Sequence, residues 1–403
     1  MAGLEEKLCP VCFQEAMEHG ECRNCGYHAE ESSAVKDYLA PFTILKEKYL
    51  LGKSLGQGGF GITYLAENMQ SGLRCCIKEY FPSGLLQGRT PDGALILADE
   101  ENRPEYEEGK QQFIEEACAL QELRENISVV DILDFFEENG TAYFAMELIE
   151  GCNLRVFRKN HNPKQTLKMA LQMLFLLGSS LAEVHRFGMI HGDISPENIL
   201  ITQDGEIKLI DFGAARSFRQ GSDNKERKIY LKPNYAPYEQ YTQKPCQGPW
   251  TDIYALAATF YFIVSGRKML DALSRAKGAS YPPLHELCPA VSRQLSDVID
   301  KALAFDYHDR YRRMLDFLDA LEQVVRPEDY DIDLGALMPK SKASKQAEIH
   351  VETSDDSEKM CQVEEQNMPE PKRLAAFFHP KKRRLAYLEL TMRKSGGHIS
   401  RRR

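Results

Sequence analysis

The stretch His191-Gly192-Asp193-Ile194-Ser195-Pro196-Glu197-Asn198, followed by Asp211-Phe212-Gly213, decides how this chain is interpreted. Asp193 and Asp211 lie 18 residues apart, with Asn198 between them. Carboxylate and carbonyl oxygens are the ligands that Mg²⁺ prefers in proteins, often together with phosphate oxygens. Each triplet alone is weak, because such sequences are common in ordinary turns. The ordered set predicts two magnesium-binding groups, Asn198 and Asp211, around the Asp193 carboxylate.

A glycine-rich segment precedes this set at the place where phosphates would bind. Its residues are Gly56, Gln57, Gly58, Gly59, Phe60 and Gly61, and they separate the apolar runs Tyr49–Leu55 and Ile62–Ala66. The glycines therefore fall at the tip of a hairpin, where a backbone without Cβ atoms can fold closely over a triphosphate. A strand follows rather than a helix, which argues against a dinucleotide fingerprint.

An amine and a carboxylate follow this hairpin. Cys75-Cys76-Ile77-Lys78 is an apolar strand that ends in a single lysine, which can hold the α- and β-phosphates. The next segment predicts a helix, because an apolar stripe recurs at helical spacing: Phe113, Ala117, Leu120 and Leu123. Glu116 borders that stripe, so we expect it to face inward and to pair with Lys78.

Residues from about Tyr49 to Val325, roughly two thirds of the chain, resemble a eukaryotic-like serine/threonine protein kinase of bacteria. The resemblance implies an α+β, two-lobed fold with a β-rich N-lobe (49–148) and a helical C-lobe (149–325). It also implies ATP and Mg²⁺ (or Mn²⁺) as cofactors and protein substrates as partners. The positions that would contact ATP are Gly56, Gln57, Gly58, Gly59, Phe60, Gly61, Cys76, Lys78, Met146, Glu147, Ile149 and Leu200.

The resemblance extends beyond the nucleotide site. Glu239, near the end of the segment that follows Asp211, resembles the glutamate that pairs with a distant arginine, here Arg310. Asp252 resembles the buried aspartate of the large central helix. A solvated surface pair of Glu239 and Arg310 would contribute only about 0–1 kcal/mol. We expect a buried pair instead.

Three positions depart from the family pattern. Gly192 replaces the arginine that reads a phosphate on the activation segment, so we expect little dependence on phosphate at Ser217, Ser222 or Tyr230. Ser195 replaces the lysine that touches the transferring phosphate, and Lys232 replaces a threonine. The last two changes are reciprocal. We infer an exchange that keeps one amine and one hydroxyl beside Asp193; drift in a decaying active site is the alternative.

Four of the eleven cysteines form a separate N-terminal pattern. Cys9, Cys12, Cys22 and Cys25 make two C-x-x-C knuckles in a segment with few apolar residues. One structural Zn²⁺ held by four thiolates would supply the missing folding energy. Paired disulfides or a redox pair are the alternative. We therefore expect a zinc ribbon over residues 1–30 and a linker over 31–48.

Two other segments lie outside these motifs. The 37 residues between Lys78 and Glu116 exceed a simple connection and predict an insertion on the N-lobe, with a strand-like stretch at Ala94–Leu97. A passive loop is the expectation, and a docking site for a regulator is the alternative. Residues 326–403 predict a disordered tail. From 372 onward this tail carries eleven Lys and Arg against Glu389 alone, which favours an anionic partner such as a membrane surface or nucleic acid. A solvated tail is the alternative.

Composition agrees with a reduced, soluble class of protein. The chain has 403 residues, 43% of them hydrophobic, and no secretory pattern at its start. Its longest apolar stretch, Ile253–Val264, is too short to span a bilayer, which predicts no transmembrane segment and a cytoplasmic location. The sequence thus predicts an ATP-dependent kinase acting on protein serine or threonine. The alternatives are a nucleotide-binding pseudokinase scaffold and, more distantly, a small-molecule kinase.

Overall fold

The computed structural model describes residues 8–14, 16–29, 37–58, 61–123, 126, 128–212, 231–242, 246–329 and 331, and only the backbone of 216 and 217. Contacts divide the chain into two units, Met1–Ser344 and Lys345–Arg403, and every described residue belongs to the first. The predicted tail over 326–403 therefore lies outside the described residues, apart from 326–329 and 331.

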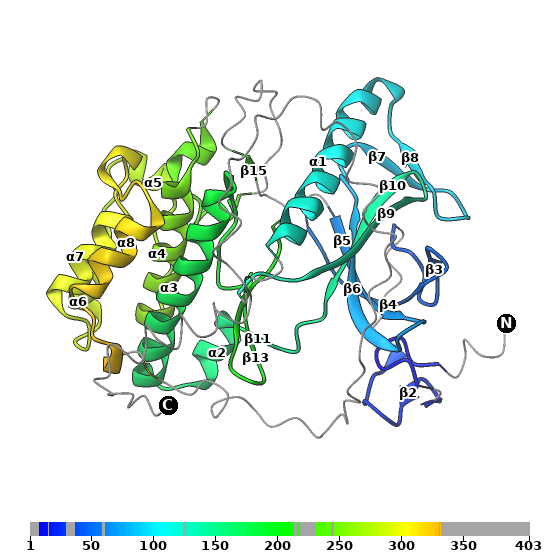
Figure 1. The fold of residues 1–403 in the computed structure, drawn as a ribbon, viewed down its shortest axis with the longest axis horizontal. Coiled ribbons are helices and arrows are strands. Elements are labelled where there is room, and N and C mark those ends of the chain that lie inside the picture. Colours follow the sequence, from blue (N-terminus) through cyan, green and yellow to red (C-terminus); the bar gives the residue numbers. More distant parts are fainter. Residues whose placement is uncertain are drawn as a thin grey trace, which may run out of the picture. The chain divides into compact units, whose positions relative to one another are not determined.

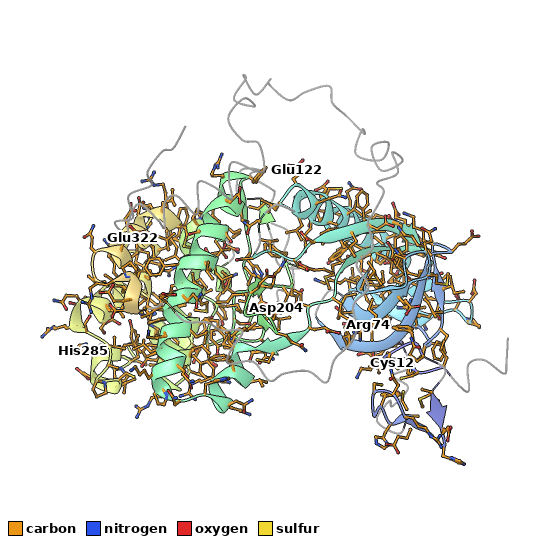
Figure 2. All side chains as sticks on the ribbon, turned by 60° about the horizontal axis from the view of Figure 1, so that its bottom comes forward. Cys12, Arg74, Glu122, Asp204, His285 and Glu322 are labelled. Atoms are coloured by element: carbon orange, nitrogen blue, oxygen red, sulfur yellow. The ribbon has the colours of Figure 1, made fainter. Side chains whose placement is uncertain are left out.

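The N-terminal cysteines belong to a small two-stranded module, which we call the ribbon (residues 8–14 and 16–29). Strands β1 (Met17–Glu18) and β2 (Glu21–Cys22) pair antiparallel, with Met17 opposite Cys22. His19 and Gly20 make the turn with positive φ angles. Cys9 and Cys22 are buried, and Figure 2 labels Cys12 in the same module.

A six-stranded antiparallel sheet forms the N-lobe in the order β3-β4-β5-β6-β10-β9. Its strands are β3 (Ile44–Leu45), β4 (Tyr49–Gln57), β5 (Gly61–Asn68), β6 (Leu73–Tyr80), β9 (Ile132–Glu138) and β10 (Thr141–Glu147). The predicted glycine hairpin joins β4 and β5, where Gly58 N–H donates to the Gly61 carbonyl. Strand β3 falls within the predicted linker over residues 31–48. This part of the linker belongs to the sheet, because β3 pairs with β4 and the side chain of Leu45 is buried on one face.

Helix α1 (Arg103–Glu122) packs against β9 and β10 (Figure 1). The predicted stripe is confirmed: Phe113, Ala117 and Leu120 are buried in the helix, and Leu123 is buried after its last turn. The Phe113 and Phe144 rings lie 4.8 Å apart, which is a contact of helix with sheet. This packing brings Glu116 toward β6 and Lys78.

The insertion is folded, and one of its strands lies in the stretch Ala94–Leu97 that the sequence predicts to be strand-like. Strands β7 (Leu86–Arg89) and β8 (Leu95–Leu97) form a hairpin, and η2 (Glu100–Asn102) leads into α1. Arg89 forms an ion pair with the fully buried Glu79 and donates to the Asp37 carbonyl at 2.7 Å. Tyr64 and Tyr143 donate to the same carboxylate at 3.0 and 2.7 Å.

The C-lobe is built on two long helices. Helix α3 (Pro163–Arg186) starts with a capping box between Asn162 and Gln165, and α4 (Pro249–Ser265) is buried from Thr251 to Val264. α3 alone, among the described residues, is long and apolar enough to cross a membrane. Its apolar face packs against α4 and α8 (Met314–Glu322), as a core helix does.

Shorter elements complete this lobe. They are α2 (Leu154–Asn160), η3 (Tyr238–Tyr241), α5 (Ala272–Ala276), α6 (Leu284–Leu287), α7 (Arg293–Ala302), η4 (Tyr307–Asp309) and η5 (Pro327–Asp329). Five short strands hold the polar loops: β11 (Gly151–Asn153), β12 (Met189–Ile190), β13 (Ile199–Thr202), β14 (Ile207–Leu209) and β15 (Arg216–Ser217). The predicted α+β class, with a strand-rich lobe and a helical lobe, is confirmed (Figure 1).

Candidate active site

The loop from His191 to Asn198 leaves β12 and is held from below by a buried carboxylate. Asp252 on α4 accepts the N–H of His191 and of Gly192, each at 2.9 Å, and contacts His185 Nε2 at 2.8 Å. Burial alone would raise the pKa of Asp252. The His185 side chain and the Gly192 N–H outweigh burial and hold the pKa below its usual range.

Gly192 has a structural reason to be glycine. Its φ of +76° lies in the left-handed region, which side-chain-bearing residues rarely adopt. Its carbonyl accepts from the Gln240 side chain at 2.8 Å. The backbone of Gly192 is thus held through both its N–H and its carbonyl, which orients the next residue, Asp193.

Asp193, Ser195 and Lys232 meet at this loop. The Lys232 ammonium lies 2.9 Å from Asp193 Oδ2 and donates to Ser195 Oγ at 2.9 Å. Asn198 donates to the same Asp193 carboxylate at 2.9 Å. Burial raises the pKa of Asp193 above its usual value, although the Lys232 charge opposes the shift. The structure therefore brings together the hydroxyl and the amine that the sequence suggested had exchanged places.

Lys78 and Asp211 form the second charged centre. Lys78 Nζ lies 2.5 Å from Asp211 Oδ1, and Asp211 has a φ of +64°. Burial opposes the charge of Lys78, but the Asp211 and Glu116 carboxylates raise its pKa. The Lys78 charge in turn lowers the pKa of Asp211 to about 2. The two side chains are therefore a charged pair at neutral pH.

Glu116 stands beside this pair without joining it, which differs from the predicted Lys78–Glu116 ion pair. Its Oε1 is buried and has no hydrogen-bond partner among the described residues. Burial raises the pKa of Glu116 to about 8, while the Lys78 charge pulls the other way. A carboxylate that loses water without gaining a partner favours its neutral form. Lys78 has only one ammonium, and in this structure Asp211 holds it.

The predicted magnesium ligands are neighbours through a hairpin. Ile199 pairs with Leu209 across β13 and β14, so Asn198 and the segment before Asp211 leave at the same end. Ile210 N–H donates to the Asn198 carbonyl at 2.9 Å. Asn198 uses its side-chain nitrogen on Asp193, which leaves its amide oxygen as the atom for a metal. A carboxylate and an amide oxygen suit Mg²⁺.

Most predicted adenine-contacting positions lie on two neighbouring strands and their exit. Cys76 on β6 is the register partner of Met146 on β10. Glu147 is tied down at the strand end, because its N–H donates to the Asp131 carbonyl at 3.0 Å and its carboxylate accepts from Lys208 at 2.8 Å. Leu200 lies on β13. Ile149 follows β10, whereas Gly59, Phe60 and Gly213 lie outside the described residues.

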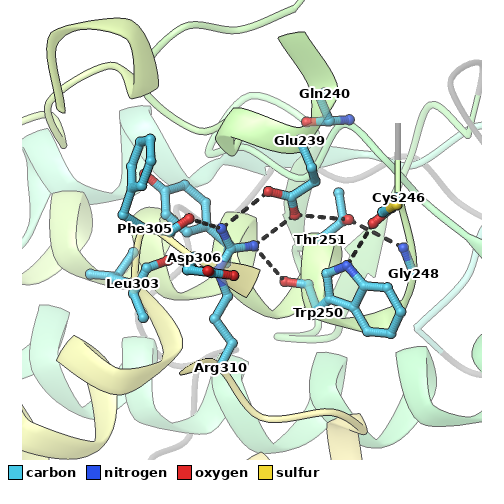
Figure 3. A network of polar contacts seen from close by, with 12 residues as sticks. Glu239, Gln240, Cys246, Gly248, Trp250, Thr251, Leu303, Phe305, Asp306 and Arg310 are labelled. Atoms are coloured by element: carbon cyan, nitrogen blue, oxygen red, sulfur yellow. Dashed lines mark hydrogen bonds and ion pairs between the residues drawn. The ribbon is translucent and has the colours of Figure 1, made fainter. Parts of the chain in front are cut away.

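Figure 3 shows the predicted partnership of Glu239 and Arg310, which is confirmed as a buried pair. The guanidinium donates to both carboxylate oxygens, at 2.7 and 3.1 Å, and Thr251 donates to one of them at 3.2 Å. Arg310 also donates to three backbone carbonyls: Ala304, Phe305 and Trp250. Such bidentate geometry fixes the segment after Lys232 against α4.

The four ribbon cysteines converge as a metal site would require. Cys9 Sγ lies 3.6 Å from Cys25 Sγ, Cys12 Sγ lies 3.6 Å from Cys22 Sγ, and all four sulfurs are within 4.8 Å of one another. Four thiolates around one Zn²⁺ at about 2.3 Å stand roughly 3.8 Å apart in a tetrahedron. The four residues therefore fit this ion.

The family model for the protein kinase domain matches residues 49–319. The chain belongs to the protein kinase family. It is similar to "Serine/threonine-protein kinase F" of Synechocystis sp., 31% identical over 286 residues (66% of this chain, 53% of that protein). It is also similar to "Serine/threonine-protein kinase PknA" of Nostoc sp., 29% identical over 289 residues (69% and 48%). The chain thus spans about half the length of these curated relatives.

A solved structure, "PpkA-294 apo form", also resembles this kinase chain. It is 34% identical, has a TM-score of 0.60, and covers 71% of this chain and 100% of its own. The ribbon precedes the part of the chain that the family model matches. Its presence is therefore a feature of this chain that the family match does not explain.

Sequence reasoning missed three polar groups that support the kinase site. His185 lies six residues before the loop that it helps to hold, and no motif points to it. Arg89 and Glu79 can be recognised as partners only once the fold of the insertion is known. The charge of Arg89 in an otherwise ordinary hairpin was the only available signal.

Proposed function

We propose that this chain is an ATP- and Mg²⁺-dependent protein kinase that phosphorylates serine or threonine hydroxyls. The observation that supports this most is the Asp193 carboxylate placed beside Asn198 and Lys232. Phosphoryl transfer depends mainly on positioning and charge stabilisation. The chain retains a group for each of these tasks.

Each residue has a separate task in this proposal. Asp193 orients the substrate hydroxyl and accepts its proton, and its raised pKa suits a base that must hold a proton briefly. Lys232 stabilises the negative charge that develops beside Asp193. With nucleotide bound, Lys78 would hold the phosphates and Glu116 would be its partner. Bound MgATP would supply the phosphoryl group, with Asn198 and Asp211 as the metal ligands.

A pseudokinase scaffold is the second candidate, motivated by Gly192 and Ser195. The Lys232 amine weakens this alternative, because it lies 2.9 Å from Asp193 and supplies the charge that Ser195 lacks. The positive φ angle of residue 192 also explains why glycine stands there, without a loss of activity. A small-molecule kinase is less well supported, because the segment 232–239 resembles the platform that holds a peptide.

The direct test is phosphotransfer from labelled ATP with Mg²⁺ to a protein substrate such as casein and to the chain itself. We expect phosphoserine or phosphothreonine in the wild type and near-complete loss in Asp193→Asn, with nucleotide affinity unchanged. Asp204→Asn, in an exposed turn labelled in Figure 2, is the control and should behave as wild type. Intact nucleotide binding with no turnover in the wild type would favour the pseudokinase.

We further propose that Cys9, Cys12, Cys22 and Cys25 bind one structural Zn²⁺. Elemental analysis of freshly purified, reduced protein should find one zinc per chain, and Cys9→Ser with Cys22→Ser should abolish it. Protein without zinc at full thiol content would contradict this assignment and would leave the redox alternative.

The remaining partner and location predictions rest on sequence alone. We propose a cytoplasmic location and an anionic partner, membrane or nucleic acid, for the basic segment 372–403. This segment lies outside the described residues, and its charge is what supports the proposal.

A further inference from the structure

Strand β4 is irregular where the ribbon touches it. Leu51 pairs with Ala66 and Ser54 pairs with Tyr64, so Gly52 and Lys53 together lie opposite Leu65. An extra residue in a strand leaves a backbone group outside the ladder. The Lys53 N–H fills this need by donating to the Pro10 carbonyl of the ribbon at 2.9 Å. The ribbon therefore completes the hydrogen bonding of a kinase strand.

Gly52 makes this approach possible. A Cβ atom at this position would lie 2.2 Å from the Pro10 carbonyl oxygen and 2.8 Å from Phe13 Cζ. The first of these is a backbone atom, so a turned side chain cannot relieve the clash. Pro10 and Phe13 are both buried, and the Lys53 ammonium lies 5.8 Å from the centre of the Tyr27 ring. The ribbon and strand β4 are therefore closely packed against each other at Gly52.

The chain that follows the ribbon contacts the same strand closer to the phosphate loop. Tyr38 donates to the Gln57 side chain at 3.3 Å, and Gln57 is the last residue of β4. Leu39 N–H donates to Tyr64 Oη at 3.2 Å on the neighbouring strand. The ribbon thus binds β4 at Lys53, and the segment 37–39 binds its last residue, Gln57.

Pro10 lies between the proposed zinc ligands Cys9 and Cys12, so the metal would fix the carbonyl that Lys53 binds. The ribbon has too little apolar surface to hold that geometry by burial alone. Four residues after Gly52, at Gly56, begins the glycine-rich segment that would cover the ATP phosphates. The metal site and the nucleotide site are therefore joined by one short strand.

We propose that the ribbon is a zinc-dependent brace of the nucleotide-binding lobe, so that zinc binding and MgATP binding strengthen each other. This inference rests on the proposed nucleotide binding. Coupling between two sites is reciprocal: the factor by which zinc raises nucleotide affinity equals the factor by which nucleotide raises zinc affinity. We expect a factor of about five or more in each direction, which is the lower end of typical coupling.

The test measures both affinities on the full chain. Zinc affinity is measured by competition with a chromogenic chelator, with and without the Mg²⁺ complex of a non-hydrolysable ATP analogue. Nucleotide affinity is measured by calorimetry in zinc-loaded and zinc-free protein. Equal factors above one support the brace. Nucleotide binding that is independent of zinc overturns the brace but leaves the kinase proposal intact, whereas no binding in either form overturns both.

Gly52→Ala keeps all four cysteines but removes the space for Pro10. It should retain one zinc per chain and lose most of the coupling. Gly84→Ala is the matched control, because a Cβ there meets no atom within 4 Å and its backbone is unstrained. If Gly52→Ala does not fold, Phe13→Ala trims the ribbon side of the contact and should lose coupling in the same way. Wild-type coupling in a folded Gly52→Ala or Phe13→Ala protein would contradict the proposed route.

Discussion

At the scale of single residues, the proposed active site differs from the family pattern in the position of one amine. The Lys232 ammonium contacts both Asp193 and Ser195, which supports the proposed exchange of an amine and a hydroxyl between positions 195 and 232. Tyr235 and Ala236 N–H both donate to the Lys232 carbonyl at 2.9 Å. That turn fixes the backbone of Lys232, and a fixed charge is what stabilises a transition state without reorganisation.

Lys232→Ala should therefore lower kcat by on the order of 10²-fold and raise the KM for ATP less. The exposed Lys277→Ala is the control for a lost surface charge. The double variant Ser195→Lys with Lys232→Thr should recover part of the activity, whereas Ser195→Lys alone places two amines together. Steady-state rates of the two singles and the double form a cycle that gives the coupling directly. Additive effects would mean that Lys232 is only a surface lysine on the substrate side.

At the scale of elements, the sequence predicted best where a motif and its periodicity agree. The glycine hairpin, the stripe of α1 and the loop from His191 to Asn198 are all where the spacing predicts. Strand β3 was missed because a strand of two residues is too short to show an alternation of apolar and polar side chains. In this structure Lys78 binds Asp211 and not the predicted Glu116, because proximity in the fold does not decide which of two carboxylates one ammonium binds.

The strand-like stretch of the β7–β8 insertion was predicted, but its anchor is a long-range pair that no local pattern reveals. Arg89 and Glu79 side chains are 6% and 0% exposed, and two tyrosines satisfy the same carboxylate. Glu79 directly follows Lys78 on β6. The hairpin therefore stabilises the strand that carries the phosphate-binding lysine.

Arg89→Met should lower the free energy of unfolding by about 3–5 kcal/mol, because it leaves the Glu79 charge buried and unpaired. Arg74→Met is the matched control: it also breaks an Arg–Glu pair, but Arg74 and Glu150 are 34% and 42% exposed. That change should cost about 0–1 kcal/mol. Urea unfolding of both variants decides the question. Equal costs would show that the insertion is not held by this pair.

At the scale of the whole molecule, one buried carboxylate joins the helical core to the catalytic loop. Asp252 on α4 binds His185 at the end of α3 and two successive N–H groups of the loop. Glu239, which is paired with Arg310, also accepts a hydrogen bond from Thr251 of α4. The segment that carries Lys232 and Glu239 is thus held on the same helix. The loop from His191 to Asn198 is thus bonded directly to the helical core. A change that disturbs this part of the core should therefore also disturb the loop.

Asp252→Asn should lower both stability and kcat, because an amide cannot accept from all three donors and its nitrogen would face a backbone N–H. The expected loss near pH 7 is about 3–5 kcal/mol, typical of disrupting a buried charged network. The folded-state pKa of Asp252 is below its usual value, so its stabilising effect is complete above that usual value and is lost as pH falls through the folded pKa. The stability difference between wild type and Asp252→Asn should therefore shrink below about pH 4. Denaturant unfolding from pH 3 to 8 measures it, with the exposed Asp204→Asn as the control. A difference that stays constant across that range would show that Asp252 acts through packing and not through its charge.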